Sequence, residues 1–166
     1  MASPRVGIVG AGNRARVHVE QLYTLRDRTY LGTDDDRATE QRYESHAGDV
    51  PDWVANVADL DPSVTALFDP DADQRERTAA LCADHGDDPV AFDDFETFLA
   101  DAEFDAVILA SPNDYHAEQA VPLLDRDVDL LCEKPLADDL PGHDRIIAAA
   151  RDSAATLYPA YNLRSA

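Results

Sequence analysis

The fold of this chain is decided by the stretch Val6-Gly7-Ile8-Val9-Gly10-Ala11-Gly12-Asn13-Arg14-Ala15, close to its beginning. The residues from Arg5 to Val9 form an apolar run typical of a buried strand, and a helical pattern follows from Arg14 to Leu25. The apolar positions of this pattern share one face: Ala15, Val19, Leu22 and Leu25. The stretch therefore predicts a strand, a glycine-containing turn and a helix.

The turn has the residue types that bind the pyrophosphate of a dinucleotide. Gly10 permits the tight bend, Gly12 lets the backbone approach the phosphates, and Ala15 lets the helix pack closely on the strand. The N–H groups at the start of the helix then face the anion, with Asn13 and Arg14 beside it. An ordinary glycine-rich turn that binds no ligand is the alternative interpretation.

Strands and helices alternate through the rest of the chain. Apolar runs predict strands at 64–68, 89–92, 106–110, 128–132 and 156–161, and helical patterns lie at 72–85, 94–100, 115–124 and 140–151. This alternation predicts an α/β fold with a doubly wound parallel sheet in a single domain. The polar, acidic stretch 29–61 interrupts the pattern. We expect it to form a partly helical insertion packed by Tyr43, Trp53 and Leu60.

Composition limits the classes of function. A formal net charge of −20, from 34 acidic and 14 basic residues, argues against binding to nucleic acid, because phosphates would be repelled. A hydrophobic content of 45% argues against disorder. We expect a cytoplasmic protein of a salt-adapted organism, with no membrane span or signal peptide. The acidic runs are interpreted as solvated surface rather than metal sites, and Cys82 and Cys132 as buried reduced thiols.

A dinucleotide site of this kind needs a carboxylate at the end of the second strand to bind the adenosine ribose. Asp34 lies 34 − 12 = 22 positions after Gly12, which is the usual spacing, but its preceding segment is short and broken by glycine. Asp69 ends a convincing buried strand and is favoured for that reason. An acid here favours NAD, because a 2′-phosphate would meet like charge, whereas Arg75 and Arg77 on the following helix keep NADP open.

Three motifs together make the resemblance to a known family specific. They are Gly10–Ala15 with His18, the loop Ser111–His116, and Cys132-Glu133-Lys134-Pro135-Leu136. The chain resembles the N-terminal NAD(P)-binding Rossmann domain of the Gfo/Idh/MocA family, named after glucose-fructose oxidoreductase and inositol dehydrogenase. The resemblance covers nearly the whole chain except 29–61. It implies hydride transfer between NAD(P) and a carbinol carbon of a sugar, inositol or related polyol.

The resemblance also implies roles for individual residues. Lys134 would be the catalytic residue that hydrogen-bonds the reacting oxygen or the nearby ribose and helps to polarise the substrate. The other implied positions contact the cofactor or orient the loops around it: Ser111, Pro112, Asn113, His116 and Glu133. Gly12, Asp69, Ser111 and Lys134 all follow predicted strands, at the edge where such sheets bind ligands.

Members of this family normally continue into a second domain that holds the substrate and supplies a catalytic His. These 166 residues contain no counterpart of that domain, so we expect cofactor binding without a complete substrate site. A non-catalytic cofactor-binding module, or a subunit that needs a separate substrate domain, is the rival interpretation.

Overall fold

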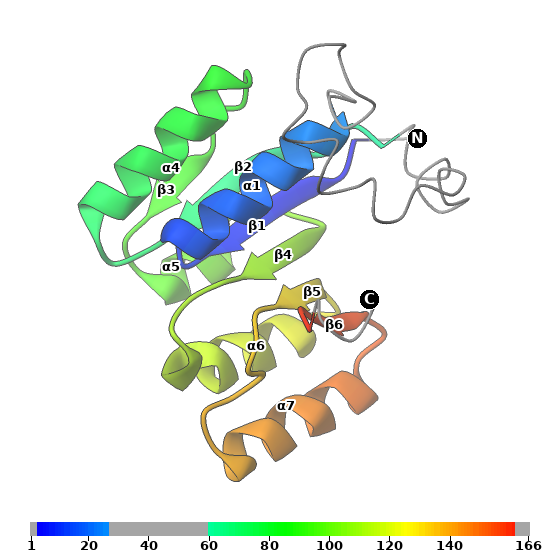
Figure 1. The fold of residues 1–166 in the computed structure, drawn as a ribbon. Coiled ribbons are helices and arrows are strands. Elements are labelled where there is room, and N and C mark those ends of the chain that lie inside the picture. The colour runs from blue at the N-terminus through cyan, green and yellow to red at the C-terminus, as the bar shows by residue number, and fades with distance from the viewer. Residues whose placement is uncertain (1–2, 27–59, 162–166) are drawn as a thin grey trace, which may run out of the picture.

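A computed structural model describes residues 3–26 and 60–161. Its centre is a parallel six-stranded sheet with the order β3-β2-β1-β4-β5-β6 (Figure 1). The strands are β1 (Arg5–Val9), β2 (Ser63–Phe68), β3 (Val90–Phe92), β4 (Ala106–Leu109), β5 (Asp129–Cys132) and β6 (Leu157–Pro159). The order reverses between β1 and β4, which creates the crevice where doubly wound sheets bind ligands.

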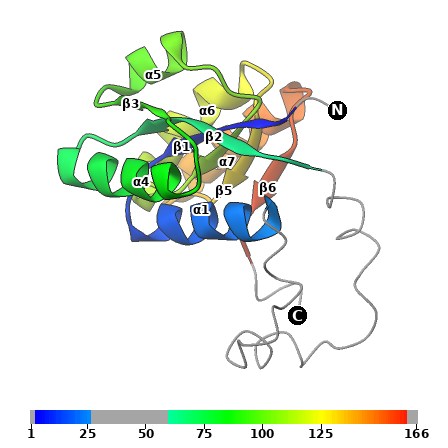
Figure 2. The same ribbon diagram turned by 90° about the horizontal axis from the view of Figure 1, so that it is seen from above.

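Helices cover both faces of the sheet. Figure 2 shows α1 and α4 on one side, and α5, α6 and α7 on the other. Their bounds are α1 (Asn13–Arg26), α4 (Ala72–Asp84), α5 (Phe95–Asp101), α6 (His116–Leu124) and α7 (Leu140–Asp152), and a 3-10 turn, η3 (Asn113–Tyr115), precedes α6. The doubly wound fold predicted from the sequence is confirmed. The predicted insertion at 29–61, with Tyr43 and Trp53, lies almost wholly outside the described residues.

Each face of the sheet contributes to its own apolar core, because side chains alternate along a strand. On the α1 side, Ile8 and Leu67 are fully buried against the helices. On the other side, Phe98 of α5 is fully buried and stacks on Phe104, with ring centroids 5.1 Å apart. These strands are continuous apolar runs in the sequence because the side chains on both of their faces are buried.

The inner face of α1 differs from its prediction at the C-terminal end. Ala15 and Val19 are buried as expected, but Leu25 is exposed and Tyr23 is buried in its place. The Tyr23 hydroxyl donates a hydrogen bond to Asp87 Oδ2 at 2.8 Å, and this carboxylate also accepts from the Val64 backbone N–H at 2.7 Å. At this end of α1, the hydrogen bond of Tyr23 to Asp87 decides which residue is buried, rather than the spacing of the apolar residues.

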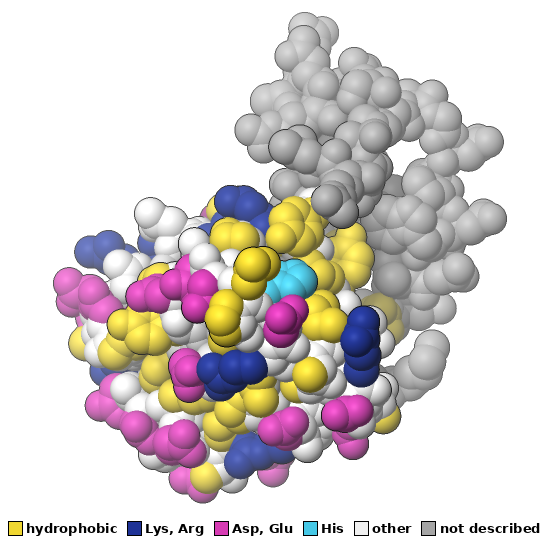
Figure 3. All heavy atoms as spheres, turned by 90° about the horizontal axis from the view of Figure 1, so that it is seen from below, with side chains coloured by type: hydrophobic (Ala, Val, Ile, Leu, Met, Phe, Trp, Pro, Cys, Tyr) yellow, Lys and Arg dark blue, Asp and Glu magenta, His cyan; other side chains and the backbone are white. Residues whose placement is uncertain are grey.

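Acidic residues do more than cover the surface. Asp94 and Asp139 cap the N-termini of α5 and α7 by accepting backbone N–H groups, as Asp71 does for α4. The Thr97 hydrogen bonds lower the pKa of Asp94 below its ordinary value. Figure 3 nevertheless shows many acidic side chains spread over one face of the molecule.

The two cysteines are free and buried, as predicted. Burial raises the pKa of Cys132 to about 12 and also raises that of Cys82, which keeps both thiols protonated and unreactive. Among residues 3–26 and 60–161, no helix has the length and apolar character needed to cross a membrane.

Candidate dinucleotide site

The glycine turn between β1 and α1 has the geometry that its sequence predicts. Gly10 adopts a φ of +82°, and a Cβ placed on it would lie 2.4 Å from the backbone nitrogen of Ser111. Only glycine fits this position. A Cβ on Gly12 would meet no protein atom within 4 Å. The backbone at Gly12 therefore faces open space, which is what a close approach by phosphate requires.

The turn is fixed to the unit formed by β2 and α4. The Gly10 N–H donates to the Phe68 carbonyl at 2.8 Å, and the Ala11 N–H donates to Asp69 Oδ2 at 2.8 Å. The buried Thr78 hydroxyl donates to the Ala11 carbonyl at 2.7 Å. The turn thus keeps its shape through contacts of its own backbone and leaves the outer side open.

Asp69 lies directly after β2, where the sequence argument placed the ribose-binding acid. Its carboxylate accepts from Ala11 and, through Oδ1, from the Asp71 N–H at 2.9 Å. Arg75 donates through Nη1 to the Asp69 carbonyl at 2.7 Å and the Pro70 carbonyl at 3.1 Å. The rival Asp34 lies outside the described residues.

Asn13 begins α1, and its side chain is engaged within the protein. Its Oδ1 accepts a hydrogen bond from Arg16, whose guanidinium also donates to the Ala11 carbonyl at 3.1 Å and to Gln74 at 3.0 Å. Asn13 is exposed at the mouth of the turn. That Asn13 lies beside the cofactor stays a prediction.

The loop after β4 carries the predicted Ser111, Pro112 and Asn113. Pro112 and Asn113 are exposed, whereas the Ser111 hydroxyl donates to Gln119 of α6. The fully buried His116 lies with Nε2 2.9 Å from the Ser111 carbonyl and Nδ1 3.0 Å from the Pro135 carbonyl. Its imidazole therefore connects this loop to the loop after β5, an orienting arrangement of the kind that the resemblance implied.

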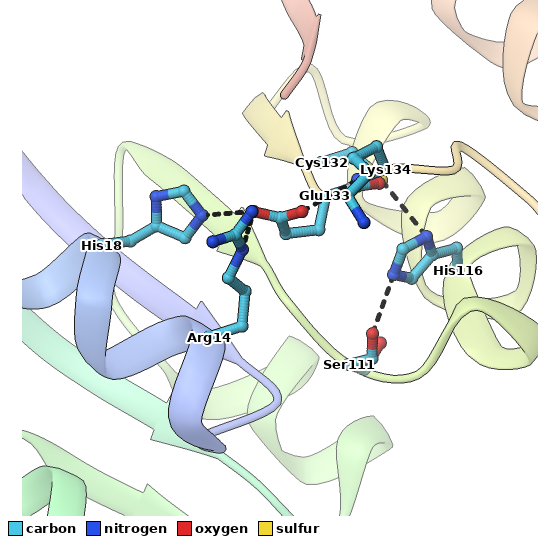
Figure 4. Close-up of polar contacts among 7 residues, drawn as sticks. All are labelled: Arg14, His18, Ser111, His116, Cys132, Glu133 and Lys134. Atoms are coloured by element: carbon cyan, nitrogen blue, oxygen red, sulfur yellow. Dashed lines mark hydrogen bonds and ion pairs between the residues drawn. The ribbon is translucent and has the colours of Figure 1, made fainter. Parts of the chain in front are cut away.

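The loop after β5 places Glu133 and Lys134 differently from each other (Figure 4). Lys134 is exposed, and no described residue engages its Nζ. Glu133 is buried and turns toward α1, where its Oε1 accepts from Arg14 Nε at 2.6 Å and contacts His18 Nε2 at 2.8 Å. Its Oε2 accepts from the Lys134 backbone N–H at 3.1 Å.

These contacts determine the charge state of Glu133. Burial by itself raises the pKa of a carboxyl group, but the hydrogen bonds from His18, Arg14 and the Lys134 N–H outweigh it. The pKa of Glu133 therefore lies below its ordinary value, and the carboxylate is ionised at neutral pH.

The structure thus brings the predicted residues to the carboxyl ends of β1, β2, β4 and β5. Sequence reasoning assigned no role to His18, Thr78 or Gln119. His18 stands four residues after Arg14, so the two share a helix face, a signal available in the sequence. Its partner Glu133, 115 positions away, gave no such signal.

A family model for oxidoreductases with an NAD-binding Rossmann fold, the Gfo/Idh/MocA family, matches residues 4–161. The chain belongs to this family. Its Gfo/Idh/MocA domain is 35% identical over 109 residues to scyllo-inositol 2-dehydrogenase (NADP+) of Bacillus subtilis. The matched region covers 65% of this chain and 32% of that protein. The domain is 33% identical over 93 residues to D-xylose 1-dehydrogenase (NADP+) 2 of Haloferax volcanii, covering 56% and 29%.

The fold of this Gfo/Idh/MocA domain also matches solved structures. The crystal structure of the WlbA dehydrogenase from Bordetella pertussis, in complex with NADH and UDP-GlcNAcA, superposes with a TM-score of 0.68 at 18% identity, covering 95% of this chain and 37% of that one. The chain spans about a third of the length of the curated relatives it matches. It is therefore an NAD(P)-binding oxidoreductase domain, equivalent to the N-terminal part of these longer proteins.

Proposed function

We propose that the domain serves a dehydrogenase that moves a hydride between a nicotinamide cofactor and a sugar, inositol or related polyol. The observation that carries this proposal is the exposed Lys134, whose Nζ no described residue engages, at the same sheet edge as the open backbone of Gly12. The curated relatives are named as dehydrogenases of scyllo-inositol and D-xylose, which supports this substrate class. Residues outside these 166 would hold the substrate.

In this proposal, the chain holds the dinucleotide at three places. The open side of the turn at Gly12 takes the pyrophosphate on the backbone N–H groups at the start of α1, with Asn13 and Arg14 beside it. Asp69 accepts hydrogen bonds from the adenosine ribose. Ser111, Pro112 and Asn113 line the nicotinamide half, oriented by His116.

Lys134 is the proposed catalytic residue. When bound, the nicotinamide accepts or supplies the hydride. The Lys134 ammonium donates a hydrogen bond to the carbinol or carbonyl oxygen that reacts, which stabilises the charge that develops there. Because Nζ is exposed and meets no described partner, it is available for this contact.

We further propose that NAD is preferred over NADP, because the Asp69 carboxylate would repel a 2′-phosphate. Arg75, the cation nearest to it along the chain, already donates to two backbone carbonyls. Calorimetric titration of the 166-residue protein in concentrated KCl should show saturable binding of NADH, with a lower Kd than for NADPH. Equal or reversed affinities would remove this role from Asp69. The absence of any saturable binding would contradict the proposed function itself.

We also propose a salt-adapted, cytoplasmic protein that does not bind nucleic acid, on the basis of the net charge of −20. At 0.01 M salt the Debye length is roughly 30 Å, so like charges repel one another across the whole domain. We expect the melting temperature to rise steeply from dilute buffer to molar KCl, as measured by circular dichroism. A melting temperature that does not change with salt would refute the proposed salt adaptation.

A further inference from the structure

Two segments that are distant in the sequence meet at the carboxylate of Glu133. Arg14 and His18 lie in the first turns of α1, and Glu133 follows β5. Since β4 lies between β1 and β5 in the sheet, the carboxylate connects α1 to the loop after β5 across the end of β4 (Figure 4). Only 7% of the Glu133 side chain is exposed, and both of its oxygens accept from protein donors. Its burial and these contacts direct the carboxylate at the protein rather than at a ligand.

Arg14 has the opposite character. Its Nε is bound to Glu133, but no described residue engages either Nη atom, and 44% of its side chain is exposed. It is the second residue of α1, directly after the turn whose backbone is open at Gly12. A guanidinium held along one edge presents its remaining N–H groups as a planar fork, the geometry that fits phosphate oxygens.

We propose that Glu133 is a positioning residue that acts through Arg14. Its carboxylate holds the guanidinium with the free Nη atoms directed at the diphosphate of the dinucleotide, and it fixes the backbone of Lys134 through the Lys134 N–H. This inference rests on the proposed function, because it assumes that the turn binds a dinucleotide. It assigns Glu133 to the support of Arg14 and Lys134 rather than to contact with the cofactor.

Holding Arg14 in place has a physical benefit. A free arginine loses rotamer entropy when it binds a ligand, and an ion pair formed in advance removes part of that cost. The pair also needs both members, because a buried carboxylate without its cation is strongly unfavourable. The two residues should therefore behave as one unit in cofactor binding.

A double-mutant cycle on NADH binding tests this unit. Glu133→Gln keeps the shape of the side chain but loses its charge, and we expect the Kd for NADH to rise about tenfold, the effect of one charge-assisted hydrogen bond. Arg14→Gln should have a similar effect. The double variant should bind NADH about as weakly as Arg14→Gln alone. If the two contacts were independent, their effects would multiply and the Kd would rise about a hundredfold.

The chain offers a matched control. Glu118 of α6 pairs with Arg145 of α7 at 2.9 Å, and both side chains are exposed. Glu118→Gln removes the same charge from another ion pair, and we expect the Kd for NADH to change by less than about twofold, since exposed pairs contribute little. If Glu133→Gln does not fold, Arg14→Lys replaces it, because lysine keeps the charge but lacks the fork. It should bind NADH about tenfold more weakly.

Nitrogen NMR of the His18 ring provides a measurement without cofactor. A carboxylate only accepts hydrogen bonds, so contact with Glu133 Oε1 requires the proton on Nε2. We expect this proton in the wild-type protein and a loss of the preference for Nε2 in Glu133→Gln. A wild-type His18 with its proton on Nδ1 alone would overturn the arrangement.

The outcomes separate the two proposals. Suppose that the wild-type protein binds NADH and that the increases in Kd caused by Glu133→Gln and Arg14→Gln multiply in the double variant. This result would overturn the positioning role and leave the proposed function intact. The same holds if Arg14→Lys binds NADH as tightly as the wild type. Wild-type protein that does not bind NADH would overturn the proposed function, and the positioning role with it.

Discussion

Gly10→Ala should destabilise the domain by about 4 kcal/mol or more, which is exceptional for the addition of one methyl group. Two costs add: alanine would have to adopt a φ of +82°, and its Cβ would lie within 2.8 Å of three backbone atoms of the Ala110–Ser111 segment. Backbone atoms cannot move aside as a flexible side chain can. The melting temperature, followed by circular dichroism, should fall by about 10 °C or more for a domain of this size.

Two other glycines serve as controls for this result. Gly86 has a nearly identical φ of +86°, but a Cβ there would meet nothing within 4 Å. Gly86→Ala should therefore cost only the conformational strain of about 1 to 2 kcal/mol. Gly12→Ala should leave stability unchanged and weaken NADH binding, because its open space is the proposed phosphate site. Equal stability losses at Gly10 and Gly86 would show that the close backbone approach has no energetic importance.

Asp69→Ala should raise the Kd for NADH about 10- to 100-fold, since charge-assisted hydrogen bonds contribute about 1.5–3 kcal/mol. The substitution removes the proposed ribose acceptor and also the acceptor for the Ala11 N–H of the turn. Asp69→Asn keeps an acceptor for the Ala11 N–H in its amide oxygen, while it loses the charge and the second acceptor, which the Asp71 N–H uses. We expect Asp69→Asn to reduce the preference for NADH over NADPH.

The rival acid provides the control. Asp34→Ala should leave the Kd for NADH almost unchanged, as measured in the same calorimetric titrations. A large effect at Asp34 with none at Asp69 would mean that the ribose-binding acid was assigned to the wrong position. That result would leave the strand order untouched, because β2 pairs with β1 over Ser63–Phe68 in the structure.

Local patterns in the sequence were sufficient to predict most of the fold. The buried strands are continuous apolar runs, and the run before Asp69 identified β2 although it lies far from the glycine turn. The prediction was wrong where a polar contact decided burial. Tyr23 is buried with its hydroxyl donating a hydrogen bond to Asp87. The spacing of apolar residues in the sequence carries no information about such a partner.

The candidate site shows the same limit. The sequence identified Glu133 and Lys134 as neighbours in one motif, and their side chains point to different surroundings. The direction of Glu133 depends on Arg14 and His18, which reach it only after the sheet has formed. Contacts between residues more than a hundred positions apart are set by the tertiary fold, so local spacing could not predict them.

The anchoring of α1 at both of its ends has a consequence for the kinetics of cofactor binding. Asp69 and Thr78 form hydrogen bonds to the turn that leads into the helix. Near the other end of the helix, the Tyr23 hydroxyl donates a hydrogen bond to Asp87. The turn is therefore ordered before any dinucleotide arrives, and the entropy of ordering it belongs to folding rather than to association. NADH would then bind in a single step, with an observed rate that increases in proportion to its concentration and reaches no plateau set by a slow rearrangement.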